Sequence, residues 1–383
     1  MTVCYWGTYD ADYPRNRILI AGMRDSRIDV RECHFPLWKD TSQKLRHARS
    51  GWFNPVLLLR CARAYGSLAL RFLTSPRPDY LFVGYSGHFD VFPAWVICRL
   101  RGVPLVFDAF LSLYDSLVLD RDSVARNGVK AKFLAWVDRT ACRLADRVLL
   151  DTQAHATFFR ESFGLPAGKF WVLPIGADDR VFHPGAETPR NGRPLTVLHF
   201  GRYIPLHGLE TVVRAARLIE EGGETCRFLM VGDGEERQKI EDLAGRLGVR
   251  SLEFRGAEPP DRLAATIGEA DICLGIFGQT GKASRVIPNK VYESMASQKP
   301  VITGDSPAAR ELLTDGVDCL LCRRGDPEAL AEAILRLRRD EALAKRLAHA
   351  GHVLFERKAS PAVIGQELAR RLQEWTGRNE QAA

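Results

Sequence analysis

The chain has 383 residues, of which 46% are hydrophobic and 26% charged, and its formal net charge is +7. This is ordinary globular composition with enough length for about two domains, and it excludes a low-complexity or solenoid protein. The N-terminus lacks the basic start and long apolar stretch of a secretory signal, so we expect a cytoplasmic protein.

The first half alternates apolar strand-like runs with helical patterns. Such alternation, with strands apolar enough to be buried on both sides, predicts a parallel sheet covered on both faces. The expected strands are residues 2–7, 28–35, 79–85, 104–110, 147–152 and 169–176, and the expected helices are 16–26, 54–73, 92–102 and 129–145. We assign residues 1–185 to an N-terminal domain of this type.

Positive charge is concentrated in that first half. Residues 1–185 hold 25 Lys and Arg against 18 Asp and Glu, whereas the remainder balances at 29 against 29. Between residues 39 and 77 only Asp40 is acidic, and eight residues are basic: Lys39, Lys44, Arg46, Arg49, Arg60, Arg63, Arg71 and Arg77. No recognisable nucleic-acid-binding module accompanies the charge, so we expect no nucleic acid partner.

The helix expected at 54–73 is both basic and amphipathic. At about 100° per residue, Arg60, Arg63 and Arg71 share one side. The opposite side is apolar and carries Leu57, Leu58, Cys61, Tyr65, Leu68 and Phe72. Three arginines exclude a membrane-spanning helix. Two interpretations stay open: segment 39–77 lies on an anionic membrane surface, or the helix covers the core of its own domain.

A polar stretch rich in Pro and Gly follows, and we take residues 186–194 as a linker. The alternation then restarts. Expected strands cover 195–202, 226–234, 252–256, 272–278, 300–304 and 319–324, and expected helices cover 208–221, 235–247, 260–269, a segment from 288, and 327–338. We therefore predict an α/β fold of two doubly wound Rossmann-like domains facing a cleft. Its second domain is residues 195–360, and a C-terminal helix at 361–383 could pack back on the first domain.

The nine cysteines are scattered, and their odd number is poor evidence for a disulfide framework. Cys319 and Cys322 have the spacing of metal ligands, but no second pair exists and the run between them is typical of a buried strand. A structural zinc site needs four ligands, so we expect no metal.

Three stretches of the second half carry possible ligand chemistry. Gly232-Asp-Gly234 lacks the third glycine of a dinucleotide site, which favours tight strand-to-helix packing. Arg202 and His207 flank a loop before a helix, where cations suit a phosphate, although a purely structural loop is the alternative.

The third stretch is a glycine-punctuated loop with Lys282, Ser284 and Arg285, followed by a helix that bears Glu293. Backbone N–H groups and cations can gather around a diphosphate, and a carboxylate one turn into the helix can accept ribose hydroxyls. Glu293 could instead be a solvated helix residue. A nucleoside diphosphate that carries a sugar would use all of these groups.

Four motifs stand out between about residues 195 and 340: "GRYIPLHG", "MVGDGEER", "PNKVYESMASQKPVITG" and "ELLTDGVDCLL". Through them this part of the chain resembles the retaining glycosyltransferases of the GT-B fold, family 4. The N-terminal half is similar more loosely, through "YPRN". The resemblance implies that Arg202 contacts the donor diphosphate and that Glu293 hydrogen-bonds the ribose.

Two positions depart from the family pattern. His207 stands where the family often has a lysine, and Arg285 stands where it often has a glutamate facing the sugar. We therefore expect Lys282, Arg285 and Lys290 to supply charge to the diphosphate together with Arg202 and His207. Asn289, Gly232 and Arg255 complete the expected nucleotide site around Glu293.

The N-terminal side should hold the acceptor and any group that moves a proton. Many family members carry a histidine after a strand there, but "PLVFDAFLSLYD" has none. The candidates are Asp108 and Asp115 in that loop and His88 after the preceding strand, each of which could equally be a turn or capping residue.

The sequence thus predicts an enzyme that transfers a sugar from a nucleotide sugar to an acceptor hydroxyl with retention. It would act by front-face substitution, with no metal or other cofactor. The acceptor would be a sugar or a lipid-linked molecule in cell-surface polysaccharide or glycolipid assembly, and the enzyme could be peripheral on the inner face of the plasma membrane. The alternatives are a nucleotide-sugar epimerase or hydrolase of this fold, or a catalytically silent nucleotide-sugar-binding subunit.

Overall fold

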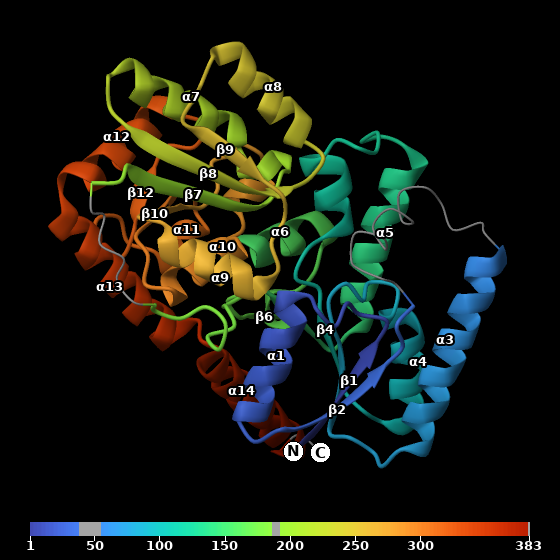
Figure 1. Cartoon of the computed structure of the whole chain (residues 1–383). Helices are drawn as coiled ribbons and strands as arrows, with labels where there is room; N and C mark the ends of the chain where they lie inside the picture. Colours follow the sequence, from blue (N-terminus) through green and yellow to red (C-terminus); the bar gives the residue numbers. More distant parts are fainter. Residues whose placement is uncertain (38–54, 186–191, 382–383) are drawn as a thin grey trace. The chain divides into compact units, whose positions relative to one another are not determined.

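The computed structural model describes residues 1–37, 55–185 and 192–381 (Figure 1). By its internal contacts the chain divides into two compact units. Unit 1 comprises Met1–Pro174 together with the segment that starts at Pro361, and unit 2 comprises Ile175–Ser360. This division falls earlier than the end of the N-terminal domain assigned from sequence, because the chain leaves the sheet of unit 1 soon after its last strand.

Unit 1 is a parallel sheet with helices on both faces. Its strands are β1 (Thr2–Gly7), β2 (Asp29–His34), β3 (Tyr80–Val83), β4 (Leu105–Asp108), β5 (Arg147–Leu150) and β6 (Phe170–Val172). Its helices are α1 (Pro14–Asp25), α3 (Pro55–Thr74), α4 (Val91–Arg101), α5 (Val129–Leu144), α6 (Gln153–Phe163) and α14 (Pro361–Gln381), with the short turns η1 (Asp115–Asp120) and η2 (Ala167–Lys169). The strand order is β2-β1-β3-β4-β5-β6.

The alternation of side chains along each strand creates two cores in unit 1. Cys4 and Trp6 of β1 pack with α3 to α6, whereas Val3 and Tyr5 pack with α1 and α14. This is the two-sided burial that uniformly apolar parallel strands predict. In unit 1, helix α6 is the α-helix that the sequence analysis did not assign. Its N-cap Thr152, whose side chain accepts from the His155 N–H, is the signal that marks its start.

Helix α3 confirms the helix expected at 54–73, which is part of the basic segment 39–77. Lys39, Lys44, Arg46 and Arg49 of that segment lie outside the described residues. Its buried face carries Leu57, Cys61, Ala64, Leu68 and Phe72, so the helix does cover the core of its own unit. Leu58 was expected on that face and is 53% exposed instead. The reason is geometric, because one residue of helix turns the side chain about 100° away from Leu57.

Helix α14 packs on α1 through two glycines. A Cβ at Gly365 would lie 1.8 Å from the carbonyl oxygen of Gly22, and a Cβ at Gly22 would lie 2.3 Å from the carbonyl oxygen of Pro361. The hydroxyl of Tyr80 donates to the carbonyl of Leu372 at 2.8 Å. The last helix of the chain therefore belongs to the first unit.

Unit 2 repeats the architecture. Its strands are β7 (Leu195–Arg202), β8 (Cys226–Asp233), β9 (Leu252–Arg255), β10 (Ile272–Leu274), β11 (Val301–Gly304) and β12 (Leu320–Cys322). Its helices are α7 (Leu209–Glu221), α8 (Arg237–Leu247), α9 (Pro260–Glu269), α10 (Asn289–Ala296), α11 (Ala309–Leu312), α12 (Pro327–Arg339) and α13 (Glu341–Lys358), with the turns η3 (Pro205–His207) and η4 (Lys282–Ser284). The order β12-β11-β10-β7-β8-β9 is again parallel throughout.

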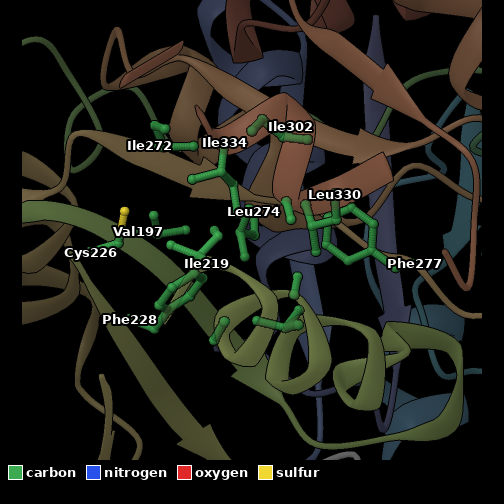
Figure 2. Packing of buried hydrophobic residues seen from close by; sticks show 14 of the residues in the cluster. Val197, Ile219, Cys226, Phe228, Ile272, Leu274, Phe277, Ile302, Leu330 and Ile334 are labelled. Carbon is green, nitrogen blue, oxygen red and sulfur yellow. The ribbon is translucent and has the colours of Figure 1, made fainter. Parts of the chain in front are cut away.

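Figure 2 shows the core that α7 and α12 form with this sheet. Val197 and Phe228 from the strands meet Ile219 of α7 and Ile334 of α12, and all four are buried. The Cys319-to-Cys322 run is the expected buried strand, and both thiols are buried and free. Across the sheet, α10 packs against α13, β10 and β11, which holds its first turn at the carboxyl ends of the strands.

The glycine contact between α1 and α14 leads to a stability test. We expect Gly365→Ala to lower the free energy of unfolding by about 1–3 kcal/mol, because the added methyl meets backbone that has to move. The matched control is Gly377→Ala on the same helix, where a Cβ meets nothing within 4 Å. That variant should leave stability unchanged or raise it by up to about 1 kcal/mol. Equal urea midpoints for the two variants would contradict the close packing of α14 on α1.

Candidate functional site

The loops after β7 and β10 flank the point where the strand order of unit 2 reverses. From β7 the chain proceeds to β8 and β9 on one side, and β10, β11 and β12 lie on the other. In open parallel sheets the carboxyl ends of strands at such a reversal leave a crevice for ligands. Residues 202–208 and 275–288 are therefore placed where the topology favours binding.

These two loops are fixed to each other. The Phe277 N–H donates to the His207 carbonyl at 3.0 Å, and the Gly278 N–H donates to the Leu206 carbonyl at 3.2 Å. A Cβ at Gly208 would lie 2.4 Å from the Gly278 nitrogen, so the loops approach as closely as glycine allows. Arg324, which the sequence analysis missed, donates to the carbonyls of Gly278 and Thr280 at 3.0 and 3.3 Å.

Three basic side chains meet beneath the loops. The Nζ of Lys290 lies 3.3 Å from Nε2 of His199 and 3.3 Å from Nδ1 of His207. All three residues are buried. Lys290 is in the first turn of α10, His199 is on β7 and His207 ends η3, so three separate elements bring them together. The sequence analysis included His207 and Lys290 but missed His199, which only its place on β7 reveals.

Burial controls the protonation of this cluster. It lowers the pKa of Lys290 well below its ordinary value, and the carboxylate of Glu293 only partly opposes that effect. Burial likewise lowers the pKa of His199, and the neighbouring Lys290 and His207 lower it further. The cluster thus holds fewer protons than its residue types would carry in water, and an anion placed beside it would draw protons in.

Glu293 lies one turn beyond Lys290 on the same helix. Burial raises its pKa to about 7, with Lys290 acting in the opposite direction. Its side chain is nevertheless partly accessible, and so is that of Asn289 at the start of α10. The helix therefore presents a carboxylic group and an amide above a buried basic cluster. The interpretation of Glu293 as a simply solvated residue does not match this environment.

The other expected diphosphate residues lie around the same loops. Arg202 is exposed at the end of β7, Lys282 is buried in η4, and Arg285 is partly exposed directly after it. Turns η3 and η4 are in contact, which brings His207 and Lys282 into one neighbourhood. Arg285 occupies the position where the family resemblance implies a glutamate.

Gly232 and Arg255 lie on the other side of β7. Gly232 has a φ of +139°, and a Cβ there would lie 1.8 Å from the Gly201 carbonyl oxygen, so packing alone requires this glycine. Arg255 is on the edge strand β9, where its Nε donates to Glu253 at 2.7 Å. Arg237, which the sequence analysis did not single out, joins the two positions by donating to both of their carbonyls.

In unit 1 the three residues expected to handle protons are all buried. Asp108 pairs with Arg15, whose Nε lies 3.0 Å from its Oδ2. Burial raises the pKa of Asp108, and Arg15 opposes this effect. Arg15 also donates to the carbonyls of Leu173 and Pro174, so the pair joins α1, β4 and the end of the unit. Asp108 thus helps to hold α1 against β4 through Arg15, and its part in proton transfer stays a prediction.

His88 and Asp115 surround a further carboxyl group, that of Asp138 on α5. The Nε2 of His88 donates to the Leu111 carbonyl at 2.8 Å and lies 3.5 Å from Asp138. Asp138 accepts from the Ser112 hydroxyl at 2.6 Å and from the Tyr114 N–H at 2.9 Å. Burial raises the pKa of Asp138 to about 7, and these hydrogen bonds oppose it. Asp115 donates its N–H to Ser112.

Asp138 therefore lies beside His88, and its hydrogen bonds hold the loop that bears Asp115. Its sequence setting gave no signal, because it is one polar residue within an amphipathic helix. Arg15, by contrast, falls within the "YPRN" run that the sequence analysis had quoted.

Within the described ranges, no cluster of three or more His, Cys, Asp or Glu side chains is arranged to hold a metal ion. In the same ranges, no helix combines the length and hydropathy needed to cross a bilayer.

Two family models match the chain. Residues 194–340 match the model described as glycosyl transferases group 1, and residues 9–176 match a glycosyl transferase 4-like domain. Alpha-D-kanosaminyltransferase of Streptomyces kanamyceticus is 26% identical over 302 residues, which are 74% of each chain. Phosphatidyl-myo-inositol mannosyltransferase of Mycobacterium leprae is 34% identical over 43% of this chain and 42% of its own.

A lipopolysaccharide core biosynthesis glycosyltransferase of Rhizobium meliloti, LpsD, is 28% identical over 46% of this chain and 48% of its own. The chain thus matches less than half the length of these last two relatives.

Solved structures agree on the fold. Anabaena HepE in complex with UDP-glucose superposes with a TM-score of 0.70 at 18% identity, over 97% of this chain and 99% of its own. Sucrose-phosphate synthase of Thermosynechococcus elongatus superposes with a TM-score of 0.75 at 15% identity, over 98% of this chain and 99% of its own.

The family matches cover both units, the relatives are glycosyltransferases, and the fold likeness extends over nearly the whole chain. The protein is therefore a transferase enzyme, and it belongs to the group 1 glycosyltransferases of the GT-B fold.

Proposed function

We propose that the enzyme transfers a sugar from a nucleoside diphosphate sugar to an acceptor hydroxyl with retention of anomeric configuration. The observation that carries the proposal is the gathering of Lys290, His199 and His207 at the strand reversal of unit 2, with Glu293 one turn along α10. A buried basic cluster beside an accessible carboxyl group suits a ligand with a diphosphate at one end and a ribose at the other.

His207 stands where the family often has a lysine, and it is a weaker cation. Lys290 would supply the positive charge that this substitution loses. Its Nζ lies 3.3 Å from His207, so both reach the same space below the loop after β7. Arg202, Lys282 and Arg285 would complete the cationic surroundings from the loops above. Hydrogen bonds from charged donors to phosphate oxygens are about twice as strong as neutral ones, which favours these residues over uncharged polar groups.

Glu293 and Asn289 would hold the nucleoside. A carboxylate accepts hydrogen bonds from the two hydroxyls of a ribose, and its acceptor capacity is greatest when ionised. Nucleotide contacts from Gly232 and Arg255 stay a prediction, since packing and an ion pair already explain both residues.

The proposed chemistry is a front-face substitution. The bond from the anomeric carbon to the diphosphate breaks, and its electron pair leaves with the diphosphate. The acceptor oxygen forms the new bond on the same face, and its proton passes to a departing phosphate oxygen. Preorganised cations around the leaving group would give the main stabilisation, so the mechanism needs neither a metal nor another cofactor. Proton transfer by His88, Asp108 or Asp115 stays a prediction.

The acceptor belongs to the same proposal. The relatives named for lipopolysaccharide core biosynthesis and for phosphatidyl-myo-inositol mannosyl transfer support an acceptor in cell-surface polysaccharide or glycolipid assembly. A cytoplasmic enzyme that is peripheral on a membrane would reach a lipid-linked acceptor of this kind. The Anabaena structure with UDP-glucose supports a nucleotide sugar as the donor class.

Two substitutions separate the diphosphate end from the nucleoside end. We expect Lys290→Met to raise the Kd of both a nucleoside diphosphate and inorganic pyrophosphate at least about tenfold, which corresponds to about 1.4 kcal/mol. Glu293→Gln should raise the Kd of the nucleoside diphosphate by about tenfold and leave the Kd of pyrophosphate unchanged. Isothermal titration calorimetry measures both constants.

The matched control for charge is Lys345→Met, because Lys345 is an exposed residue of α13. It should change neither Kd. If Lys290→Met bound pyrophosphate with unchanged Kd, Lys290 would not contact the diphosphate. If Glu293→Gln weakened the binding of both ligands equally, Glu293 would not contact the ribose.

Stereochemistry tests the reaction itself. A panel of α-linked nucleotide sugars offered with sugar and lipid-linked acceptors should yield an α-linked product, read from the anomeric coupling in the NMR spectrum. A β-linked product would overturn retention. Interconversion of the donor without transfer would instead support an epimerase, and donor binding with no turnover on any acceptor would support a silent subunit.

A further inference from the structure

Exposed apolar side chains are concentrated on one part of unit 1. Among the described residues, twelve large hydrophobic side chains are exposed, and ten of them lie on α3, α4 and α5. Leu59 and Leu100 are both 72% exposed, Val129 is 85% exposed and Trp136 is 51% exposed. Single exposed apolar residues need no explanation, but their concentration on three elements does.

The three helices are neighbours on the same face of the sheet. All of them contribute to the core that includes Trp6, and α4 contacts both α3 and α5 (Figure 1). Each buries one stripe against the sheet, for example Leu68 of α3 and Ala141 of α5. Their outward stripes therefore form one continuous surface, which we call the α3–α5 face.

The charge of this face has a single sign. The three helices contain nine Lys and Arg residues and one carboxylate, Asp138, which is fully buried. Arg63 of α3, Arg99 of α4 and Lys132 of α5 are exposed examples. An outward surface with many cations and no exposed carboxylate of its own attracts anions and repels a second copy of itself.

Aromatic side chains add a second property. Trp136 stacks on Phe133 with ring centroids 5.9 Å apart and on Phe92 of α4 at 5.7 Å. Trp136 and Phe133 are exposed. Tryptophan in such a position prefers the boundary between water and a lipid bilayer, where an apolar ring and polar groups are both accommodated.

We infer that the α3–α5 face docks on an anionic membrane surface. Its cations would pair with acidic lipid headgroups, while Leu59, Leu100 and Trp136 would enter the headgroup boundary. This combination of apolar residues and Lys or Arg is the signature of interfacial helices, and the helices are not of the kind that crosses a bilayer. The inference goes beyond the basic helix recognised in the sequence, because it adds α4 and α5.

This surface is tested without any sugar donor, so its failure and the failure of the proposed function are separate outcomes. The full chain is mixed with vesicles of phosphatidylcholine alone or with 30% phosphatidylglycerol, and bound protein is measured by sedimentation. We expect at least tenfold tighter binding to the anionic vesicles at 0.1 M salt and a marked loss at 0.5 M salt.

Two sets of variants identify the face. The triple change Arg63→Glu, Arg99→Glu and Lys132→Glu should reduce binding at least tenfold. The matched triple Lys345→Glu, Arg346→Glu and Arg357→Glu on exposed positions of α13 should not. The pair Phe133→Ser and Trp136→Ser should weaken binding while keeping the preference for anionic lipid. A far-UV circular dichroism spectrum and a urea midpoint that match those of the wild type show that each variant is folded.

Equal binding to both vesicle types, or equal losses in the two triples, would overturn the inference. A concentration-dependent dimer in size-exclusion chromatography that the Phe133→Ser and Trp136→Ser pair abolishes would overturn it as well, because the face would then be covered by a second copy.

Discussion

The candidate site depends on one physical constraint, the burial of Lys290 between His199 and His207. An ammonium group without water is costly unless negative charge compensates it, and the two partners here are imidazoles, which can accept a hydrogen bond but carry no negative charge. Burial accordingly lowers the pKa of Lys290 well below its ordinary value. A diphosphate at the strand reversal would supply that negative charge, so the burial of Lys290 would favour the binding of an anion.

The scaffold around this cluster is rigid where the chemistry needs it. Backbone hydrogen bonds join the loops after β7 and β10, and glycines at 208 and 278 permit their approach. In unit 1, the buried Arg15–Asp108 pair and the hydrogen bonds accepted by Asp138 fix the corresponding loops. Polar groups that seemed available for proton transfer thus have structural partners, whereas in unit 2 the side chains of Glu293, Arg202 and Arg285 are accessible.

Much of the fold was predictable because both sheets are parallel and buried on two sides. Uniformly apolar runs such as residues 195–202, followed by helical patterns, define strand and helix with little ambiguity. Helix α6 was missed although its buried residues Ala156, Phe159 and Phe163 recur at helical spacing. Leu58 was placed on the wrong side of α3, since a projection by angle alone does not say where the burial stripe is centred.

The site was predictable only in part, for a related reason. Local patterns indicated His207, Lys290 and Glu293, but His199 and Asp138 act through contacts between elements far apart in sequence. The motif around Gly232 favoured tight packing, with which its close approach to Gly201 agrees, and its contact with the nucleotide stays a prediction.

Proton exchange tests the central claim most directly. Calorimetric titration with a nucleoside diphosphate at pH 7.5, in buffers of different ionisation enthalpy, counts the protons bound with the ligand. Because the ligand favours the charged form of Lys290, the wild type should take up more protons than Lys290→Met. Equal proton uptake by the two proteins would contradict a buried, anion-seeking lysine at the diphosphate site.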